Sequence, residues 1–311
     1  MTPRPVSRGP RQPPAPTRRS AVHALVGLTL AVLSSCVGLG RQDPPAVALE
    51  RGWGQFAAGE FDRAAATFAE LGSREDSDLD GRVQAWFGGA TTWHLRRPGQ
   101  DAARATALYQ RIQREAPNHD LAAWSGLQLA RLGYAVAADQ HPDYPAVAAL
   151  YEAVISRYPD HPAATEAWLM RQAMRLETAK RPDIPGLVAD LARFQRLHPE
   201  APYQAAAWSL RAYGLTLMDS AAAACSARGA AIDAYGSEGQ DPTVDLSHAR
   251  WQLACQAEFE AGDFALARAA YRRFIADYPT DQRLFVAKQE LRRMDELEAS
   301  FRAEARGNHG R

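Results

Sequence analysis

The sequence lacks the short motifs that mark the common enzyme, metal and cofactor sites. It contains no HExxH zinc signature, no closely spaced cysteine and histidine set, no serine elbow, no phosphate-binding loop and no dinucleotide fingerprint. Four of the eight histidines fall in predicted loops, mostly beside proline: His119, His141, His161 and His198. We therefore predict a protein that is not an enzyme and that needs no metal ion and no cofactor.

The chain also has no surplus of basic residues. Its 36 basic residues equal its 36 acidic residues, and five arginines precede Cys36, where no acidic residue occurs. A chain that began at Cys36 would therefore be acidic overall. Because nucleic-acid-binding domains normally carry a basic surplus, the composition argues against a nucleic-acid partner.

The apolar run near the N-terminus is too short to cross a membrane. Residues 21–33 are largely apolar, whereas a spanning helix needs about 20 such residues. Residues 1–20 are rich in proline and arginine, and we predict that they are disordered. The charge at Arg18 and Arg19, followed by the apolar run, is typical of a secretory signal.

Residues 33–36 (LSSC) resemble the lipobox of bacterial lipoproteins. The resemblance implies a signal peptide over 1–35, cleavage before Cys36, and acyl chains on its sulfur that anchor the protein stably. An ordinary signal cut nearby and a coincidentally buried cysteine are the alternatives. Val37 stands where an aspartate would retain a lipoprotein in the inner membrane, so it points to the periplasmic face of the outer membrane. Residues 36–45 are predicted to be the lipidated end and its tether.

The composition favours helices over strands. Alanine is abundant, and the apolar segments, such as residues 186–194, lack the alternation of a β-strand. At 311 residues the chain is long enough to build an extended solenoid.

A unit of about 40 residues recurs along the chain. Its second helix ends in a fixed pattern, in which Tyr or Leu is followed three positions later by an apolar residue and five positions after that by Pro. The pattern occurs as Tyr109/Ile112/Pro117, Tyr151/Val154/Pro159, Leu191/Phe194/Pro199 and Tyr271/Phe274/Pro279, while the fifth copy is degraded over 221–235. Tryptophans step in parallel through the first helices, at Trp86, Trp124, Trp168, Trp208 and Trp251. Since each helix pair needs a neighbour to bury its apolar face, we predict that the tryptophans pack at helix contacts; a ligand-binding stripe is the alternative.

The clearest copy of the unit spans residues 251–279 and resembles a tetratricopeptide repeat. The positions that carry the resemblance are Trp251, Cys255, Gly262, Phe264, Ala267, Tyr271 and Pro279. The resemblance implies an all-α fold, an α-solenoid of about six such helix pairs over residues 46–280. The amphipathic segment over 281–305 would then form the capping helix that solenoids need, and 306–311 would be a frayed tail.

The stretch 271–279 (YRRFIADYP) is similar to phrases in periplasmic tetratricopeptide-repeat lipoproteins of diderm bacteria. The families concerned are the outer-membrane barrel-assembly lipoproteins and the Tol–Pal-associated cell-division coordinators. The resemblance implies a lipid-anchored scaffold that binds other envelope proteins or peptides through the groove of its solenoid. A role in outer-membrane barrel assembly is the first alternative. A cell-wall-associated enzyme is the second, although the repeats leave no stretch long enough for a separate catalytic domain.

Four arginines recur three or seven residues after tryptophans of the first helices. They are Arg131, Arg171, Arg175 and Arg211. Such positions could line the concave groove and bind acidic side chains or the C-terminal carboxylate of a peptide partner. The alternative is that they are ordinary solvated surface arginines.

Two cysteines remain once Cys36 is assigned to the lipid anchor. An exported protein permits disulfide bonds, and Cys225 and Cys255 lie equally far along the chain from a predicted turn near Gln240. Two antiparallel helices would bring these cysteines to a similar height, so we predict a Cys225–Cys255 disulfide. Two small buried residues at tight helix contacts are the alternative.

Overall fold

The protein is a series of α-helices packed one on the next. The computed structural model describes residues 43–95, 101–137, 139–237 and 245–308, and these hold thirteen α-helices and no strand. Each helix packs on its successor, which confirms the predicted all-α solenoid. None of the helices in these residues has both the length and the apolar character that crossing a bilayer requires.

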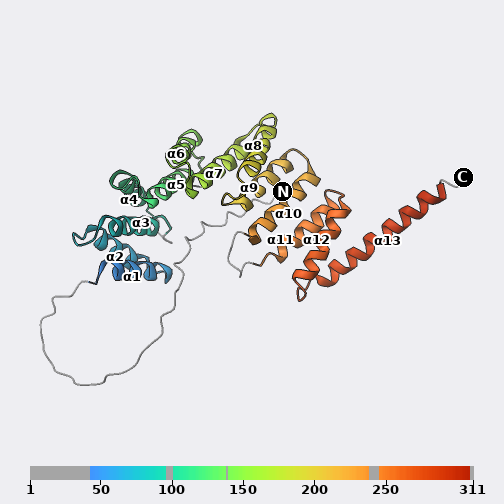
Figure 1. Ribbon diagram of the computed structural model, residues 1–311, viewed down its shortest axis with the longest axis horizontal. Helices are drawn as coiled ribbons and strands as arrows, with labels where there is room; N and C mark the ends of the chain where they lie inside the picture. The colour runs from blue at the N-terminus through green and yellow to red at the C-terminus, as the bar shows by residue number, and fades with distance from the viewer. Residues whose placement is uncertain (1–42, 96–100, 138, 238–244, 309–311) are drawn as a thin grey trace, which may run out of the picture. The chain divides into compact units, whose positions relative to one another are not determined.

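The helices form six consecutive pairs and one final helix (Figure 1). The first helices of the pairs are α1 (Pro45–Ala57), α3 (Leu79–Leu95), α5 (Asp120–Tyr134), α7 (Pro162–Thr178), α9 (Gln204–Leu217) and α11 (Ser247–Phe259). The second helices are α2 (Phe61–Ser73), α4 (Ala102–Glu115), α6 (Tyr144–Arg157), α8 (Ile184–Leu197), α10 (Ala221–Ser237) and α12 (Phe264–Asp277). The 3₁₀ helix η1 (Arg181–Asp183) directly precedes α8, and α13 (Leu284–Asn308) follows the last pair. First helices also contact one another from α1 to α3, and onward through α5 and α7 to α9.

Some predicted segments lie outside the described residues, and others have shifted bounds. The signal peptide over 1–35, the lipidation site Cys36 and the turn near Gln240 are outside. Helix α1 already begins at Pro45, because proline fits the first turn of a helix, where its missing N–H is not needed. Helix α13 continues to Asn308, past the predicted end of the capping helix.

Four of the second helices end with the same backbone geometry. The residue after the last helical position has φ between −138° and −129° and ψ between 53° and 62° in each case. These residues are Ala116, Tyr158, His198 and Tyr278, and each precedes a proline. Because the proline ring clashes with a preceding residue in α conformation, the recurring proline ends the helix at one defined position and sets the turn into the next repeat.

A histidine caps the start of two first helices, α5 and α7, and also contacts the preceding repeat. The Nδ1 atom of His161 accepts a hydrogen bond from the backbone N–H of Ala163 at 3.0 Å, and its Nε2 lies 2.8 Å from the carboxylate of Asp120 at the start of α5. Because Nδ1 accepts, Nε2 carries the proton and donates it to the carboxylate. His119 bonds Asp80 at the start of α3 in the same way. These loop histidines are therefore helix caps that bridge successive repeats.

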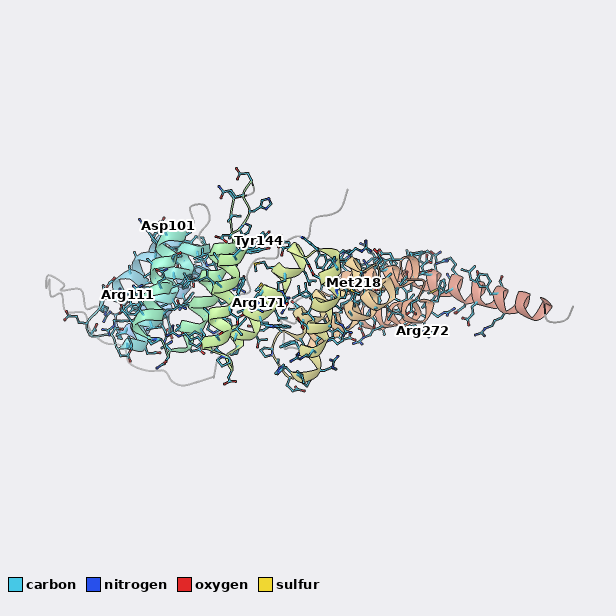
Figure 2. The ribbon with its side chains drawn as sticks, turned by 90° about the horizontal axis from the view of Figure 1, so that it is seen from above. Asp101, Arg111, Tyr144, Arg171, Met218 and Arg272 are labelled. Atoms are coloured by element: carbon cyan, nitrogen blue, oxygen red, sulfur yellow. The ribbon has the colours of Figure 1, made fainter. Side chains whose placement is uncertain are left out.

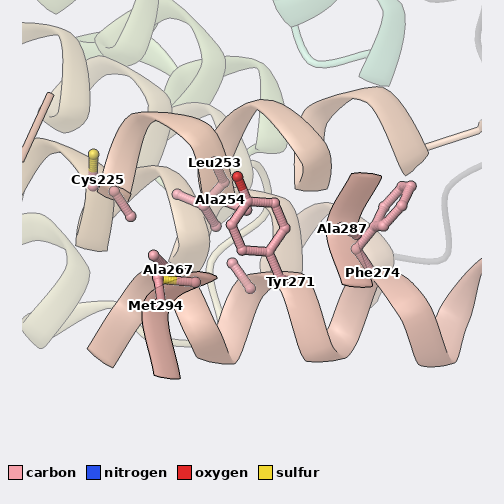
Figure 3. Close-up of a cluster of buried hydrophobic side chains, with 10 residues drawn as sticks. Cys225, Leu253, Ala254, Ala267, Tyr271, Phe274, Ala287 and Met294 are labelled. Carbon is pink, nitrogen blue, oxygen red and sulfur yellow. The ribbon is translucent and has the colours of Figure 1, made fainter. Parts of the chain in front are cut away.

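The core is distributed along the chain as local clusters centred on the second helices. In the last repeat, Tyr271 and Phe274 of α12 are fully buried against Leu253 and Ala254 of α11, and Met294 of α13 closes the cluster (Figure 3). The same positions of α4, Tyr109 and Ile112 in the sequence pattern, are also fully buried. The repeated helix ending therefore marks the residues that fill the core.

Trp86, Trp124, Trp168 and Trp251 pack at helix contacts, but their contacts differ from one repeat to the next. Trp86 is buried and donates a hydrogen bond to the carbonyl of Gly72 in the preceding helix, at 3.0 Å. Trp168 instead stacks on Phe194 of its own helix pair, with ring centroids 4.7 Å apart. The regular spacing of tryptophan in the sequence therefore does not make one continuous ladder in the structure.

Helix α10 is regular although its sequence departs from the repeat pattern. Its buried residues are small, among them Ala224, Cys225 and Ala227. Small side chains let two helices approach closely, and α10 packs over much of its length on α9. Alanine is also the best helix former, so α10 keeps its conformation without the buried Tyr or Leu of the repeated helix ending.

Candidate functional site

The structure separates the four arginines that the sequence singles out. Arg131 of α5 pairs with Glu166 of α7, and both side chains are mostly buried. Arg211 of α9 donates a hydrogen bond to the side-chain oxygen of Gln195 at 3.2 Å and lies over the ring of Trp208. These two arginines are engaged in contacts between helices of the solenoid.

The other two arginines line one open depression between α7 and α8, of about 280 Å³. Arg171 and Arg175 stand on the α7 side and Arg193 on the α8 side (Arg171 is labelled in Figure 2). Helix α7 packs less closely on α8 than the two helices of the other repeats pack on each other. The connection between them contains η1 and Pro182 instead of a tight glycine turn. The separation of the two helices leaves the space, which we call the α7–α8 depression.

Aromatic and aliphatic side chains form the apolar part of the depression. The rings of Trp168 and Phe194 stack nearly parallel, with an interplanar angle of 25°. The ring of His198 lies 5.5 Å from that of Phe194, one turn further along the chain. Leu197, the last residue of α8, is 61% exposed. The depression therefore presents apolar surface to the solvent beside its arginines.

The charged part of the depression has more guanidinium groups than carboxylates. Arg171 pairs with Glu152 of α6. Arg175 lies 3.8 Å from Asp190 and donates a hydrogen bond to Gln172 at 3.0 Å. Arg193 has no ion-pair partner within the described part of the chain. A guanidinium carries five N–H donors. The arginines of the depression therefore have several N–H donors that face the solvent.

Counting residues from the tryptophans of the first helices could not find Arg193, Leu197 or His198, because all three belong to the second helix or its end. One signal was present in the sequence. Arg193 directly precedes Phe194, which the repeated helix ending places at the core, and Leu197 follows Phe194 by about one helical turn.

No group of three or more His, Cys, Asp or Glu side chains in the described ranges has an arrangement that would hold a metal ion. His119 and His161 instead act as helix caps.

Among the histidines in the described ranges, His94, in the last turn of α3, has a clearly lowered pKa. Its ring meets that of Tyr109 edge-on at 6.1 Å. Burial, and secondarily the positive charge of Arg131, lower the pKa of His94 from 6.5 to about 4. The folded protein therefore holds this imidazole neutral at pH values where the unfolded chain binds a proton.

This difference predicts a pH dependence of stability. The contribution of His94 should be fully present above pH 6.5 and decline as the pH falls towards 4, because protonation favours the unfolded chain there. We expect the melting temperature of the wild type to drop over this interval and that of His94→Phe to drop less. His141→Phe, at an exposed loop position, is the control. Parallel melting curves for wild type and His94→Phe across the interval would contradict the assignment.

Both remaining cysteines lie in the same cluster of the last two repeats, and both are free thiols in this structure. Cys225 is fully buried, and burial raises the pKa of its thiol. The Sγ atom of Cys255 lies 3.6 Å from the hydroxyl of Tyr271. Figure 3 shows Cys225 at the edge of the cluster on the α10 side. The disulfide stays a prediction, and the packing of two small side chains stays its alternative.

The disulfide prediction is tested by counting thiols. We expect denatured protein from the exported fraction to show two more reactive thiols after reduction than before. A Cys225→Ser variant should show the same single thiol with and without reductant. Equal thiol counts in the wild type before and after reduction would rule the bond out.

Comparison with known proteins gives one family match. Residues 248–281 match the model of the tetratricopeptide repeat. No curated protein matches the chain. The matched stretch comprises α11, α12 and the turn after Pro279, which is the copy that the sequence pattern identified. The sixth helix pair of the all-α solenoid therefore carries a detected match to the tetratricopeptide repeat.

Proposed function

We propose that this protein is a non-catalytic scaffold that binds other proteins of the bacterial cell envelope through the side of its solenoid. The observation that carries the proposal is a tetratricopeptide repeat at 248–281 in series with five further helix pairs. Stacked helix pairs expose long rows of side chains, and peptide segments bind along such rows. The side chains around the α7–α8 depression suit binding, since they combine donors for hydrogen bonds with apolar surface.

The proposal includes a lipid anchor at Cys36. Its support is the order of basic residues, apolar run and LSSC at 33–36 in the sequence. We expect Cys36→Ala to leave the membrane fraction and to lose palmitate labelling. Wild-type labelling in parallel is the control. A Cys36→Ala protein that is still bound to membranes and still labelled would refute the anchor, and sorting to the outer membrane would have to be proposed on other grounds.

A narrower role in outer-membrane barrel assembly rests on the phrase YRRFIADYP at 271–279. Co-purification with a barrel-assembly protein distinguishes this role from the general one. If other envelope proteins co-purify and no barrel-assembly protein does, the narrower role is wrong and the general scaffold function is still supported.

Crosslinking in native membranes followed by purification of the full chain tests the scaffold itself. We expect defined envelope proteins to be recovered with the chain and not with an unrelated lipoprotein purified in parallel. The same preparation should not turn over cell-wall fragments. Recovery of no partner, together with turnover of such fragments, would replace the scaffold by an enzyme.

A further inference from the structure

We propose that the α7–α8 depression binds an acidic segment of a partner protein that also carries an aromatic or leucine side chain. This inference rests on the proposed scaffold function and names the chemistry of the partner. It combines three properties of the depression, namely its size, its exposed apolar surface and its excess of guanidinium groups.

The size suits a few side chains of a peptide. A volume of about 280 Å³ lies just below the range of pockets that hold drug-sized molecules. The depression is open to solvent, so a chain longer than the depression can pass over it. A short stretch of polypeptide therefore fits better than an enclosed small molecule.

The apolar surface suits a large side chain. Trp168 and Phe194 stack on one another, and the exposed Leu197 extends the apolar surface beyond them. An aromatic or leucine side chain of the partner would cover these atoms and remove them from water, which is favourable. A purely polar acidic peptide would leave this surface exposed.

The charges suit carboxylates. Arg193 has no ion-pair partner in the described residues, and Arg175 is only loosely paired with Asp190. Hydrogen bonds from guanidinium to carboxylate are strong and directional. The arginines belong to two helices, and Arg171 and Arg175 stand one turn apart, so several acidic side chains fit them better than one terminal carboxylate does.

The arginines on α7 are held in place before any partner arrives. Gln172 is almost completely buried, and its side-chain oxygen accepts a hydrogen bond from Arg175. Glu152 of the preceding helix pair holds Arg171. Side chains that are already ordered lose less conformational entropy on binding, so these contacts prepare the surface for a partner.

A labelled peptide tests the proposal on the full-length protein in detergent. The probe is a short fluorescent peptide with an amidated C-terminus, in which glutamates surround a phenylalanine. We expect saturable binding by fluorescence anisotropy that weakens at high salt. The same peptide with glutamine in place of glutamate, or with serine in place of phenylalanine, should bind at least about tenfold more weakly.

Matched arginine variants locate the binding. Arg193→Glu should weaken binding about tenfold, while Arg272→Glu, which makes the same change at an exposed arginine of α12, should change it less than about twofold. Arg272 is labelled in Figure 2. Both positions are exposed, and equal melting temperatures will show that the variants are folded. Leu197→Asp should weaken the phenylalanine peptide more than the serine peptide.

The outcomes separate this inference from the scaffold function. Equal binding by the wild type and Arg193→Glu would overturn the site, and equal losses in Arg193→Glu and Arg272→Glu would show unspecific attraction. No binding of the peptide by the wild type would overturn the partner chemistry. In each of these cases, envelope proteins recovered by crosslinking would still support the scaffold.

Discussion

Gly88→Ala is expected to lower the free energy of unfolding by about 1–3 kcal/mol, although alanine normally stabilises a helix by about 1 kcal/mol over glycine. The reason is the fully buried ring of Phe68 in α2. A Cβ atom at Gly88 of α3 would lie 2.6 Å from this ring, and one at Gly52 of α1 would lie equally close. The ring also meets Trp53 edge-on at 5.1 Å. Phe68 is therefore enclosed on several sides and cannot move away from a new methyl group.

Two further variants make the Gly88 prediction specific. Gly54→Ala, in the same helix as Gly52, meets no neighbouring atom within 4 Å and should stabilise the protein by about 0.5–1 kcal/mol. The double variant Phe68→Leu/Gly88→Ala should lose less than the sum of its single changes, since the smaller side chain makes room. Urea unfolding of the wild type, Gly88→Ala, Gly54→Ala, Phe68→Leu and the double variant measures these differences. A neutral or stabilising Gly88→Ala would show that the first two repeats are packed differently.

Arg293→Ala is expected to destabilise the last repeat by about 2–4 kcal/mol. Arg293 of α13 pairs with Glu258 of α11, whose side chain is almost completely buried. The hydroxyl of Tyr271 donates to the same carboxylate at 3.1 Å. The variant would leave a buried negative charge without its cation, which costs more than losing an exposed pair. Helix α13 would also lose a contact that holds it to the sixth helix pair.

Neutralising the carboxylate should repair most of this loss. Glu258→Gln still accepts the hydrogen bond from Tyr271 but carries no charge, so Arg293→Ala/Glu258→Gln should be more stable than Arg293→Ala alone. Thermal unfolding gives the stabilities, and hydrogen exchange over 284–298 reports whether α13 loosens. Arg302→Ala, which removes an exposed pair with Glu298 within α13, is the control. Without a rescue by Glu258→Gln, the buried charge cannot be the cause.

The helix pairs and their ends were predictable because local chemistry determines them. Beyond the first turn, proline removes a helical hydrogen bond and disfavours the α conformation of the residue before it. Pro117, Pro159, Pro199 and Pro279 therefore mark the repeat boundaries. The bridging caps were also present as a signal, since Asp80 precedes His119 by about one repeat, as Asp120 precedes His161. Their partnership becomes evident only when stacked repeats bring the two residues together.

The candidate site was less predictable because it depends on how far two helices stand apart. Arg171, Arg175, Arg131 and Arg211 all follow a tryptophan by three or seven residues. In the structure, however, Arg171 and Arg175 face the α7–α8 depression, whereas Arg131 and Arg211 contact neighbouring helices. The tryptophans show the same limit. Their spacing is regular, but the neighbours of each ring depend on the rotation of its helix, which no local pattern specifies.

Site-specific photo-crosslinking at position 197 tests the account most directly. A photoreactive amino acid replaces the exposed Leu197 in the full-length protein in living cells, and a second protein carries it at Phe285, exposed on α13. We expect a light-dependent adduct with an envelope protein from position 197, absent from position 285 and lost when Arg193→Glu is added. No adduct from position 197, or one that Arg193→Glu leaves unchanged, would contradict this expectation.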